Sequence, residues 1–312
     1  MAAQRTRLAD GRLHLNHGPI DLIIEAFGTM DEVDRAYDQA WMQFPDILPG
    51  LTGELIRLRQ PVRHSLPVFA GSVARRMASA VWPHRANFIT PMAAVAGAVA
   101  DEMLAALISC RKLRKAYVND GGDIALFLAS GERFTAGIVG DLSAPAIDGR
   151  AEITADSLVR GIATSGQGGR SFSLGIADAV TVLARSAAEA DAAATLIANA
   201  VNVDDGAIIR QPASSIDPDS DLGELPVTVA VGELSPGAIE AALDAGESEA
   251  RRLAQAGLIL AAMLQLRKLR RIVTSHGNPG SQISFDRGGN LPRRGSTFRT
   301  RAPARSPARG NS

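Results

Sequence analysis

Residues 161–201 constrain the fold more than any other stretch, because they join a glycine-rich loop, an apolar strand and a capped helix in one short span. The loop, residues 164–171, is rich in glycine and hydroxyl groups. Glycine lets the backbone turn sharply, and consecutive N–H groups in such a turn form a concave nest for phosphate oxygens. The loop is therefore a candidate anion site, with Thr164, Ser165 and Gly166 as its candidate binding residues.

The helix that follows carries a candidate metal site. Residues 177–184 are short, partly β-branched and mostly apolar, which predicts a buried strand. Ser186 and Glu189 have the spacing of a capping box, so we expect a helix to begin there. On that helix Asp191 and Thr195 are four residues apart and share a face. A carboxylate and a hydroxyl are ligands of the kind that Mg²⁺ accepts.

The same two side chains have a plainer interpretation. Asp191 can favour the dipole at the start of the helix, and Thr195 can bond back to a carbonyl of the preceding turn. Because D-x-x-x-T is a weak pattern, the spacing alone favours this interpretation over a metal site.

Composition limits the class of protein. The chain has 312 residues, 46% of them hydrophobic but only 4% aromatic, so it can bury a large core built from Ala, Val, Leu and Ile. Cys110 is the single cysteine, which excludes an intramolecular disulfide and a Cys-based metal cluster. The first residues lack the apolar core of a signal peptide, and no apolar run approaches the ~20 residues of a membrane span. We expect a cytoplasmic protein without a membrane partner.

Charge is unevenly distributed along the chain. The formal net charge is zero, but residues 275–312 contain seven Arg and one Asp, which leaves 26 basic and 32 acidic residues before them. Gly, Pro, Ser and Arg dominate this tail and apolar periodicity is absent, which predicts disorder. Its arginines can contact nucleic acid or an acidic partner, but a solvated extension is the simpler interpretation, so we do not expect a nucleic-acid ligand.

Alternating and apolar runs predict several strands, and two pairs of them read as hairpins. Residues 12–16 and 20–26 flank a turn of Asn, His, Gly and Pro, and residues 124–128 and 134–139 flank Ser130, Gly131 and Glu132. Further strands are expected at residues 206–211 and 225–231, and a helix from Ser235 to about Arg271.

A second helix of interest starts at Thr90, a plausible N-cap with Pro91 in the first helical position. Its first turns are small and apolar, so a neighbouring backbone or a ligand can approach closely. Gly97 in its interior costs about 1 kcal/mol relative to Ala and should have a packing or binding reason. Asp101 lies one turn further on.

Between these helices, residues 119–123 form a turn dense in hydrogen-bond acceptors. A tight connection needs Gly and Asn or Asp for conformational reasons, whereas a ligand-binding loop needs them for contacts. Spacing does not separate the two. The candidate binding residues are Asn119, Gly121, Gly122 and Asp123.

The succession TPMAAVAGAVADE, VNDGGDIA, ATSG, VTV and ADAAAT resembles the ApbE-like superfamily, whose characterised members are FAD-dependent FMN transferases. It looks most like an uncharacterised cytoplasmic branch. The resemblance implies one α+β domain over residues 1–274, with mixed and antiparallel sheets and packed helices. It also implies FAD and Mg²⁺, and transfer of the FMN half of FAD to a Thr of an acceptor protein.

The resemblance also implies roles for individual residues. Asp191 and Thr195 match two Mg²⁺ ligands, and a backbone carbonyl beside Ala96 is a further one. The positions that match cofactor-lining motifs are Gly97 and Asp101 of an A-K-G-x-x-x-D type helix, Gly121 and Gly122 of a GG turn, and Thr164, Ser165 and Gly166 of a TSG loop.

Three departures from the family pattern bear on activity. Ala96 stands where the transferases have Lys, residues 172–177 replace a segment that carries His, and the first residues do not match a lipoprotein signal. Losing Lys and His removes a phosphate contact and a proton-handling group, so no catalytic residue is assigned. The leading hypothesis is a Mg²⁺-dependent enzyme that acts on FAD or another pyrophosphate-containing nucleotide. The alternative is a non-catalytic flavin- or metabolite-binding protein.

Overall fold

A nine-stranded antiparallel sheet runs through the computed structural model, which describes residues 2–138, 149–169, 171–275 and 297–299. The strand order is β1-β2-β3-β4-β5-β8-β9-β12-β13, so segments far apart in sequence pair as neighbours. The bounds are β1 (Gln4–Arg7), β2 (Leu13–His17), β3 (Ile20–Phe27), β4 (Lys115–Asp120), β5 (Asp123–Leu128), β8 (Gly161–Ser165), β9 (Ala179–Ala184), β12 (Ala261–Leu266) and β13 (Leu269–Thr274).

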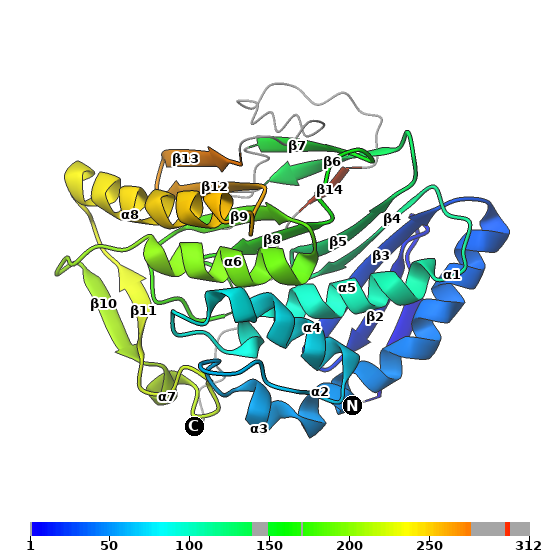
Figure 1. Cartoon of the computed structure of the whole chain (residues 1–312), viewed down its shortest axis with the longest axis horizontal. Helices are drawn as coiled ribbons and strands as arrows, with labels where there is room; N and C mark the ends of the chain where they lie inside the picture. The colour runs from blue at the N-terminus through cyan, green and yellow to red at the C-terminus, as the bar shows by residue number, and fades with distance from the viewer. Residues whose placement is uncertain (1, 139–148, 170, 276–296, 300–312) are drawn as a thin grey trace.

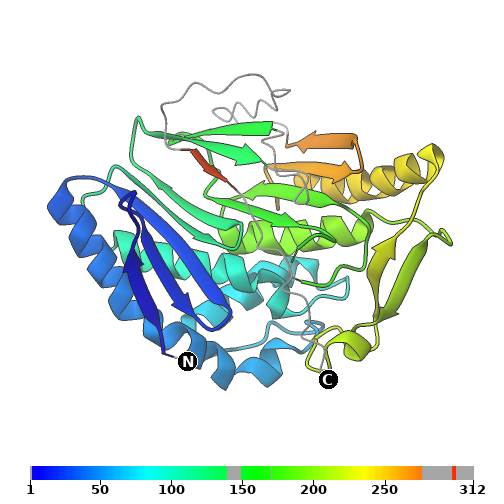
Figure 2. The ribbon, with the colours of Figure 1, turned by 180° about the vertical axis from the view of Figure 1, so that it is seen from behind.

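Helices cover one face of this sheet (Figures 1 and 2). Those that precede β4 are α1 (Met30–Gln43), the 3₁₀ turn η1 (Phe44–Asp46), α2 (Ile47–Gly53), α3 (Leu55–Leu58), α4 (Ser72–Val81), the 3₁₀ turns η2 (Trp82–His84) and η3 (Pro91–Ala94), and α5 (Val95–Ile108). The later ones are α6 (Ala187–Ala200) and α8 (Pro236–Gln255). The first group packs on β2–β5, and α6 and α8 pack on β8, β9 and β12.

The first predicted hairpin is confirmed, and its alternation shows why the sheet has a helical face. β2 and β3 pair from Leu13 with Ile24 to His17 with Ile20. Leu13, Leu15 and Ile24 are fully buried in the core beneath the helices. Because successive side chains of a strand point to opposite faces, the residues between them lie on the other side of the sheet.

Helix α5 is apolar on most of its surface because it lies in the middle of the helical layer, against β4, β5, α1, α4 and α6 (Figure 1). Ala98, Val99, Ala100 and Met103 are all fully buried. In the described part of the chain, Pro91–Ile108 is the one segment whose length and composition would suit a membrane-crossing helix, and half of it is buried inside the fold. Its apolar side chains are thus used in core packing.

The opposite face of the large sheet packs against a smaller one. Its strands are β6 (Arg133–Ile138), β7 (Gly149–Thr154) and β14 (Thr297–Arg299), with β14 parallel to β6. Tyr117 of β4 and Phe134 of β6 meet edge to face with ring centroids 6.0 Å apart. Together the mixed small sheet, the antiparallel large sheet and the helices confirm the predicted α+β class.

The predicted hairpin at residues 124–139 is wrong. β5 pairs with β4 and β8, whereas β6 leaves the large sheet and pairs with β7 in the small one. The turn at Ser130–Glu132 has a positive φ at Gly131, as a hairpin would need, but it redirects the chain between two sheets. Local turn chemistry does not specify which strand becomes the partner.

The predicted helix from Ser235 to Arg271 ends early. α8 stops at Gln255, and Gly257 follows with φ +70°, the left-handed conformation that commonly ends a helix. Beyond that point Leu264, which has helical spacing from Leu260, lies in β12, and Leu269 lies in β13; these strands pair as a hairpin. β12 is buried along its whole length, so its continuous apolar run has no alternation that would mark it as a strand.

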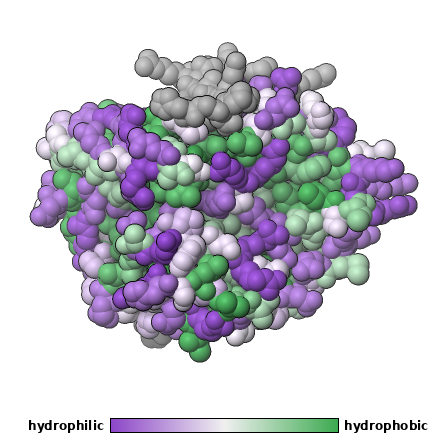
Figure 3. Space-filling model, viewed as in Figure 1, coloured by the Kyte–Doolittle hydropathy of each residue, from purple (hydrophilic) through white to green (hydrophobic). Residues whose placement is uncertain are grey.

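The strands predicted at residues 206–211 and 225–231 are confirmed as β10 (Ile208–Pro212) and β11 (Pro226–Val231), a separate pair that flanks the short helix α7 (Ala213–Ile216). On the face seen in Figure 3, hydrophilic and hydrophobic residues are interspersed. The disorder predicted for residues 275–312 falls outside the described residues, apart from Ser275 and the short strand β14.

Candidate functional site

Helices α5 and α6 meet at their N-termini, where each caps the other. Asp101 of α5 accepts the N–H groups of Ala187 at 3.0 Å and Ala188 at 2.9 Å, the first two residues of α6. Asp191 of α6 accepts the N–H of Gly97, at the start of α5, at 3.0 Å. The first turn of a helix has N–H groups without intrahelical partners, so carboxylates stabilise it there.

Gly97 makes this approach possible. A Cβ atom at position 97 would lie 2.3 Å from the carbonyl oxygen of Ala187, a distance that real side chains do not adopt. The packing reason expected for a glycine in this helix is therefore contact between the backbones of α5 and α6. Thr90 and Ser186 act as the predicted N-caps: their hydroxyls accept the N–H groups of Met92 and Glu189.

The electrostatics of the junction follow from its burial. Burial raises the pKa of Asp191 to about 7, against the hydrogen bond from Gly97 N–H, and the negative charges of Asp120 and Asp101 raise it further. Burial also raises the pKa of Asp101 to about 6, despite its two backbone donors. Several carboxyl groups thus lie close together where water solvates them poorly, an arrangement that a bound cation would stabilise.

The turn between β4 and β5 has the geometry of a two-residue hairpin. Gly121 and Gly122 both have positive φ, at 63° and 117°, and Gly122 N–H donates to the side-chain oxygen of Asn119 at 2.8 Å. This conformation favours glycine, so the tight-connection interpretation accounts for both glycines. Asp120 and Asp123 are paired across the hairpin. Their side chains lie on the face of the sheet that the helices cover, as do those of Val118 and Ala125.

Asp123 connects this turn to the glycine-rich loop, since its Oδ1 accepts the N–H of Thr164 at 3.2 Å. The Thr164 hydroxyl bonds that of Thr181 at 3.0 Å. Both lie on the face of the sheet where Ile162 and Leu183 pack, away from α6. By alternation, Ser165 is the loop residue whose side chain lies on the helical face.

Gly166 closes the loop against β9. Its φ is +155°, and an added Cβ would lie 2.6 Å from the carbonyl oxygen of Asp178. The next residue, Gln167, donates its N–H to the carbonyl of Ala177 at 2.8 Å. The glycine is therefore required by close backbone packing at the end of β8.

The donors near Asp191 suit a hard cation in kind. Thr195 lies one turn along α6, and its hydroxyl forms no hydrogen bond to any described residue, so the back-bonding interpretation is not seen. Among the described residues, no group of three or more His, Cys, Asp or Glu side chains is placed to hold a metal. Mg²⁺ needs no such group, because it takes one or two protein carboxylates and completes its shell with water and substrate phosphates. Asp191 and Thr195 therefore fit Mg²⁺.

The segment that stands where the family has its His is used in packing. Leu174 N–H donates to the side-chain oxygen of Asn199 at 2.9 Å, and Ile176 N–H donates to the carbonyl of Val201 at 2.8 Å. A Cβ at Gly175 would lie 2.1 Å from the carbonyl oxygen of Ala198. The segment thus secures the C-terminal end of α6.

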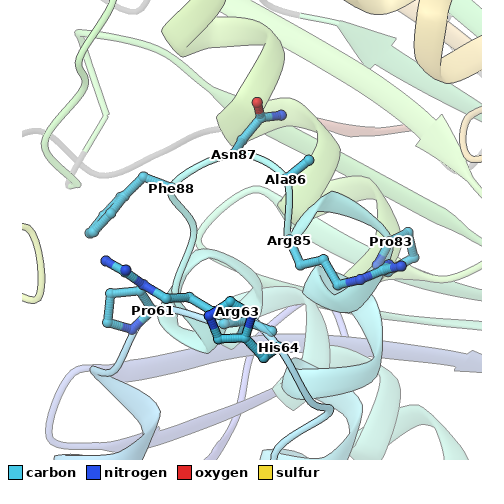
Figure 4. A pocket seen from close by; sticks show the side chains of 9 residues that line it. Pro61, Arg63, His64, Pro83, Arg85, Ala86, Asn87 and Phe88 are labelled. Atoms are coloured by element: carbon cyan, nitrogen blue, oxygen red, sulfur yellow. The ribbon is translucent and has the colours of Figure 1, made fainter.

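Two features were missed from the sequence. Asp120 is only 3% exposed, and its charge raises the pKa of Asp191. The sequence pattern identifies its neighbours in the turn as candidate binding residues but not Asp120 itself. Its alternation with buried Ala116 and Val118 is the signal that could have identified it. A cavity of about 630 Å³ lies elsewhere, lined by residues 61–64, 83 and 85–88, which include none of the predicted site residues (Figure 4).

Comparison with known families gives one match over most of the chain: the family described as AbpE bacteria matches residues 5–278.

Among curated proteins, the UPF0280 protein of Methanothrix thermoacetophila is 39% identical over 138 residues, which are 44% of this chain and 56% of that protein. The UPF0280 protein of Methanopyrus kandleri is 38% identical over 136 residues, 44% of this chain and 52% of that protein. The chain spans about half the length of the curated relatives it matches.

Among solved structures, the ApbE protein of Thermotoga maritima aligns with 12% identity and a TM-score of 0.43 over 88% of this chain and 96% of that one. The flavin transferase ApbE of Vibrio cholerae aligns with 15% identity and a TM-score of 0.38 over 88% of this chain and 98% of that one.

Proposed function

This chain belongs to the AbpE bacteria family, and from that premise we propose that it is a flavin-transferase-like protein that binds FAD, or another pyrophosphate-containing nucleotide, together with Mg²⁺. In the full reaction that the resemblance implies, the FMN half of FAD would pass to a Thr hydroxyl of an acceptor protein. The pyrophosphate bond would break and AMP would leave. Substrate, metal and acceptor are all part of the proposal.

One observation carries it: hydrogen bonds and one charge interaction link the four segments that carry the candidate site residues. Asp191 bonds Gly97, which joins α6 to α5. The charge of Asp120 acts on Asp191, and Asp123 bonds Thr164, which joins the β4–β5 turn to the end of β8. Segments that are scattered in the sequence would converge in this way if they form one binding site.

In the proposal, Asp191 and Thr195 hold the metal, with the carbonyl beside Ala96 as a further ligand. When bound, Mg²⁺ would offset the charge of the pyrophosphate oxygens. Asp101 is a positioning residue, because its two bonds to α6 fix the helix that carries Asp191. The segments 119–123 and 164–166 would contact the polar groups of the nucleotide through backbone N–H groups and the Ser165 side chain.

A non-catalytic nucleotide-binding protein is the second candidate. Ala96 supplies no charged group, and the segment in the position of the family's His packs against the end of α6 through Leu174 and Ile176. Neither place offers a proton-handling side chain. Release of AMP on incubation with FAD, Mg²⁺ and a Thr-containing acceptor separates an enzyme from a binding protein.

The binding part of the proposal is tested by thermal unfolding with FAD, with Mg²⁺ and with both. Ligand at about a hundred times its dissociation constant stabilises the native state by about 2.7 kcal/mol, which raises the midpoint by several degrees. We expect a shift that needs both additives, that is lost in Asp191→Ala and that persists in Asp38→Ala, an exposed aspartate on α1. If Asp191→Ala still shows the shift, Asp191 is not a metal ligand. If the wild type shows no shift with any combination of additives, FAD is not the ligand.

We place the protein in the cytoplasm, where both FAD and an acceptor protein would reach the site, and we propose no membrane or nucleic-acid partner. Cell fractionation with detection of the native chain tests the location. Recovery of the protein in the membrane fraction would contradict it.

A further inference from the structure

Residues 55–100 form a basic segment within an otherwise acidic body. They contain six arginines and two histidines, and no aspartate or glutamate: Arg57, Arg59, Arg63, Arg75, Arg76, Arg85, His64 and His84. Among the described residues, carboxylates from other segments pair with two of these arginines, Asp219 with Arg59 at 3.8 Å and Glu102 with Arg76 at 2.7 Å. Of the others, Arg57 and Arg75 donate to backbone carbonyls of residues 68–70, whereas Arg63 and Arg85 line one cavity together with His64.

The cavity, about 630 Å³, lies between residues 61–64 on one side and residues 83–88 on the other (Figure 4). Its size is within the range of small-molecule sites. Among the described residues that line it, Arg63, His64 and Arg85 are basic and none carries a carboxylate. In the described part of the chain, Arg63 and His64 form no ion pair or hydrogen bond through their side chains, so their donors are available to a ligand.

Arg85 is held more firmly than Arg63. Its guanidinium lies 4.4 Å from the ring centroid of Trp82 and donates to the Trp82 carbonyl at 3.1 Å. Figure 4 shows the Arg85 side chain directed toward Pro83, whereas Arg63 extends on the side of Phe88 and Pro61. Arg63 is therefore the cation that a ligand in the cavity would meet first, and Arg85 adds to the field.

An aromatic surface lies next to this cation. Phe88 lines the cavity and is 39% exposed, in a chain whose aromatic content is only 4%. Exposed aromatic rings beside arginines are the means by which proteins bind bases, because every base has a face that can stack and Arg binds the phosphate. An anion without an aromatic group would leave Phe88 unused.

We propose that this cavity is a nucleoside diphosphate site, with the base against Phe88 and the phosphates on Arg63 and His64. The site is distinct from the Asp191 junction and needs no metal or flavin, so it does not rest on the proposed function. The same chemistry could come from free nucleotide or from the ADP half of FAD. The two sources are separated by competition.

The test is calorimetric titration of the full chain with ADP, without Mg²⁺. We expect Arg63→Ala to weaken ADP roughly tenfold, the size of a lost charge-assisted hydrogen bond. Phe88→Ala should weaken it by a similar factor, the size of a lost stacking contact. Arg133→Ala, on the small sheet, is the matched control and should bind as the wild type does. Arg63→Glu, which reverses the charge at an exposed position, should abolish binding without loss of folding.

Inorganic pyrophosphate separates the two halves of the proposed site. It should bind more weakly than ADP and should respond to Arg63→Ala but not to Phe88→Ala. Pyrophosphate that binds as tightly as ADP would overturn the role of Phe88. Absence of ADP binding at millimolar concentration, or unchanged binding in Arg63→Ala, would overturn the site.

Two further arms relate the cavity to the junction. ADP binding retained in Asp191→Ala supports a separate site, and its loss there would overturn the separation. In the wild type, ADP is titrated in the presence of FAD and Mg²⁺. If FAD displaces ADP, the cavity takes the ADP half of FAD. If the two bind independently, the cavity takes a free nucleotide in addition to FAD.

Discussion

Asp101 and Asp191 exchange helix caps: the first, on α5, holds the opening N–H groups of α6, and the second, on α6, holds Gly97 N–H at the start of α5. These bonds hold the two helices together near their N-termini. They also require two carboxyl groups to lie in a poorly solvated place, where burial raises both of their pKa values.

Gly97→Ala should destabilise the protein. The added methyl group would meet the Ala187 carbonyl at 2.3 Å, so α5 and α6 must separate, and overpacking of this kind costs about 1–3 kcal/mol. Urea unfolding measures the loss. Gly50→Ala in α2 is the control: nothing lies within 4 Å of its added Cβ, so it should gain up to about 1 kcal/mol from helix propensity. Equal effects of the two substitutions would refute the close-packing role.

Asp101→Ala should loosen the start of α6. The loss of a helix cap costs about 0.5–2 kcal/mol, and here two N–H groups lose their acceptor. Asp101→Asn keeps one acceptor oxygen and should lose less. Amide hydrogen exchange at Ala187 and Ala188 is the specific readout, because these two amides should exchange faster in the Ala variant. Unchanged protection would contradict the assignment.

Thr164→Val should leave the Thr181 hydroxyl, which is 2% exposed, without its partner. A buried unsatisfied polar group costs about 1–3 kcal/mol, whereas replacing both partners by apolar groups is nearly neutral. Thr164→Val should therefore be less stable than the double variant with Thr181→Val. Strictly additive losses in the thermodynamic cycle would show that the two hydroxyls do not interact.

His84 should make the protein sensitive to acid. Burial lowers the pKa of His84 to about 4, and the charge of Arg252 lowers it further, against the opposing effect of Glu249. Below the ordinary pKa of about 6.5, the unfolded chain binds a proton that the folded one does not, so stability falls as pH drops from about 6.5 to 4.

The corresponding variant is His84→Gln, which cannot titrate. Its free energy of unfolding should depend less on pH over that interval, by at most about 1.4 kcal/mol per pH unit. Denaturant titrations at closely spaced pH values measure the slope. Parallel plots of the free energy of unfolding against pH for the wild type and the variant would contradict the prediction. They would mean that His84 has the same pKa in the folded and unfolded states.

Features with a local cause could be predicted from the sequence. The caps at Thr90 and Ser186 were identified because a capping side chain and its N–H group are two or three residues apart. The β2–β3 hairpin followed from alternation that one buried face imposes. The need for a packing reason at Gly97 was also evident, because glycine is costly inside a helix.

Features with a distant cause could not. Nothing near Asp101 in the sequence indicates that its partners are Ala187 and Ala188, so its capping role appears only once the helices are packed. The pairing of β6 with β7 could not be predicted for the same reason. The partner of a strand depends on which of its faces is buried, and the adjoining turn does not determine it. In β12, complete burial removed the alternation that distinguishes a strand from a helix.

The order of the large sheet has a kinetic consequence. β5 pairs with β8 across residues 129–160, and β9 pairs with β12 across residues 185–260, so each pairing closes a long loop. Topologies dominated by such distant pairings fold slowly, because loop closure must precede the contacts that reward it. We therefore expect refolding on a timescale of roughly milliseconds to seconds.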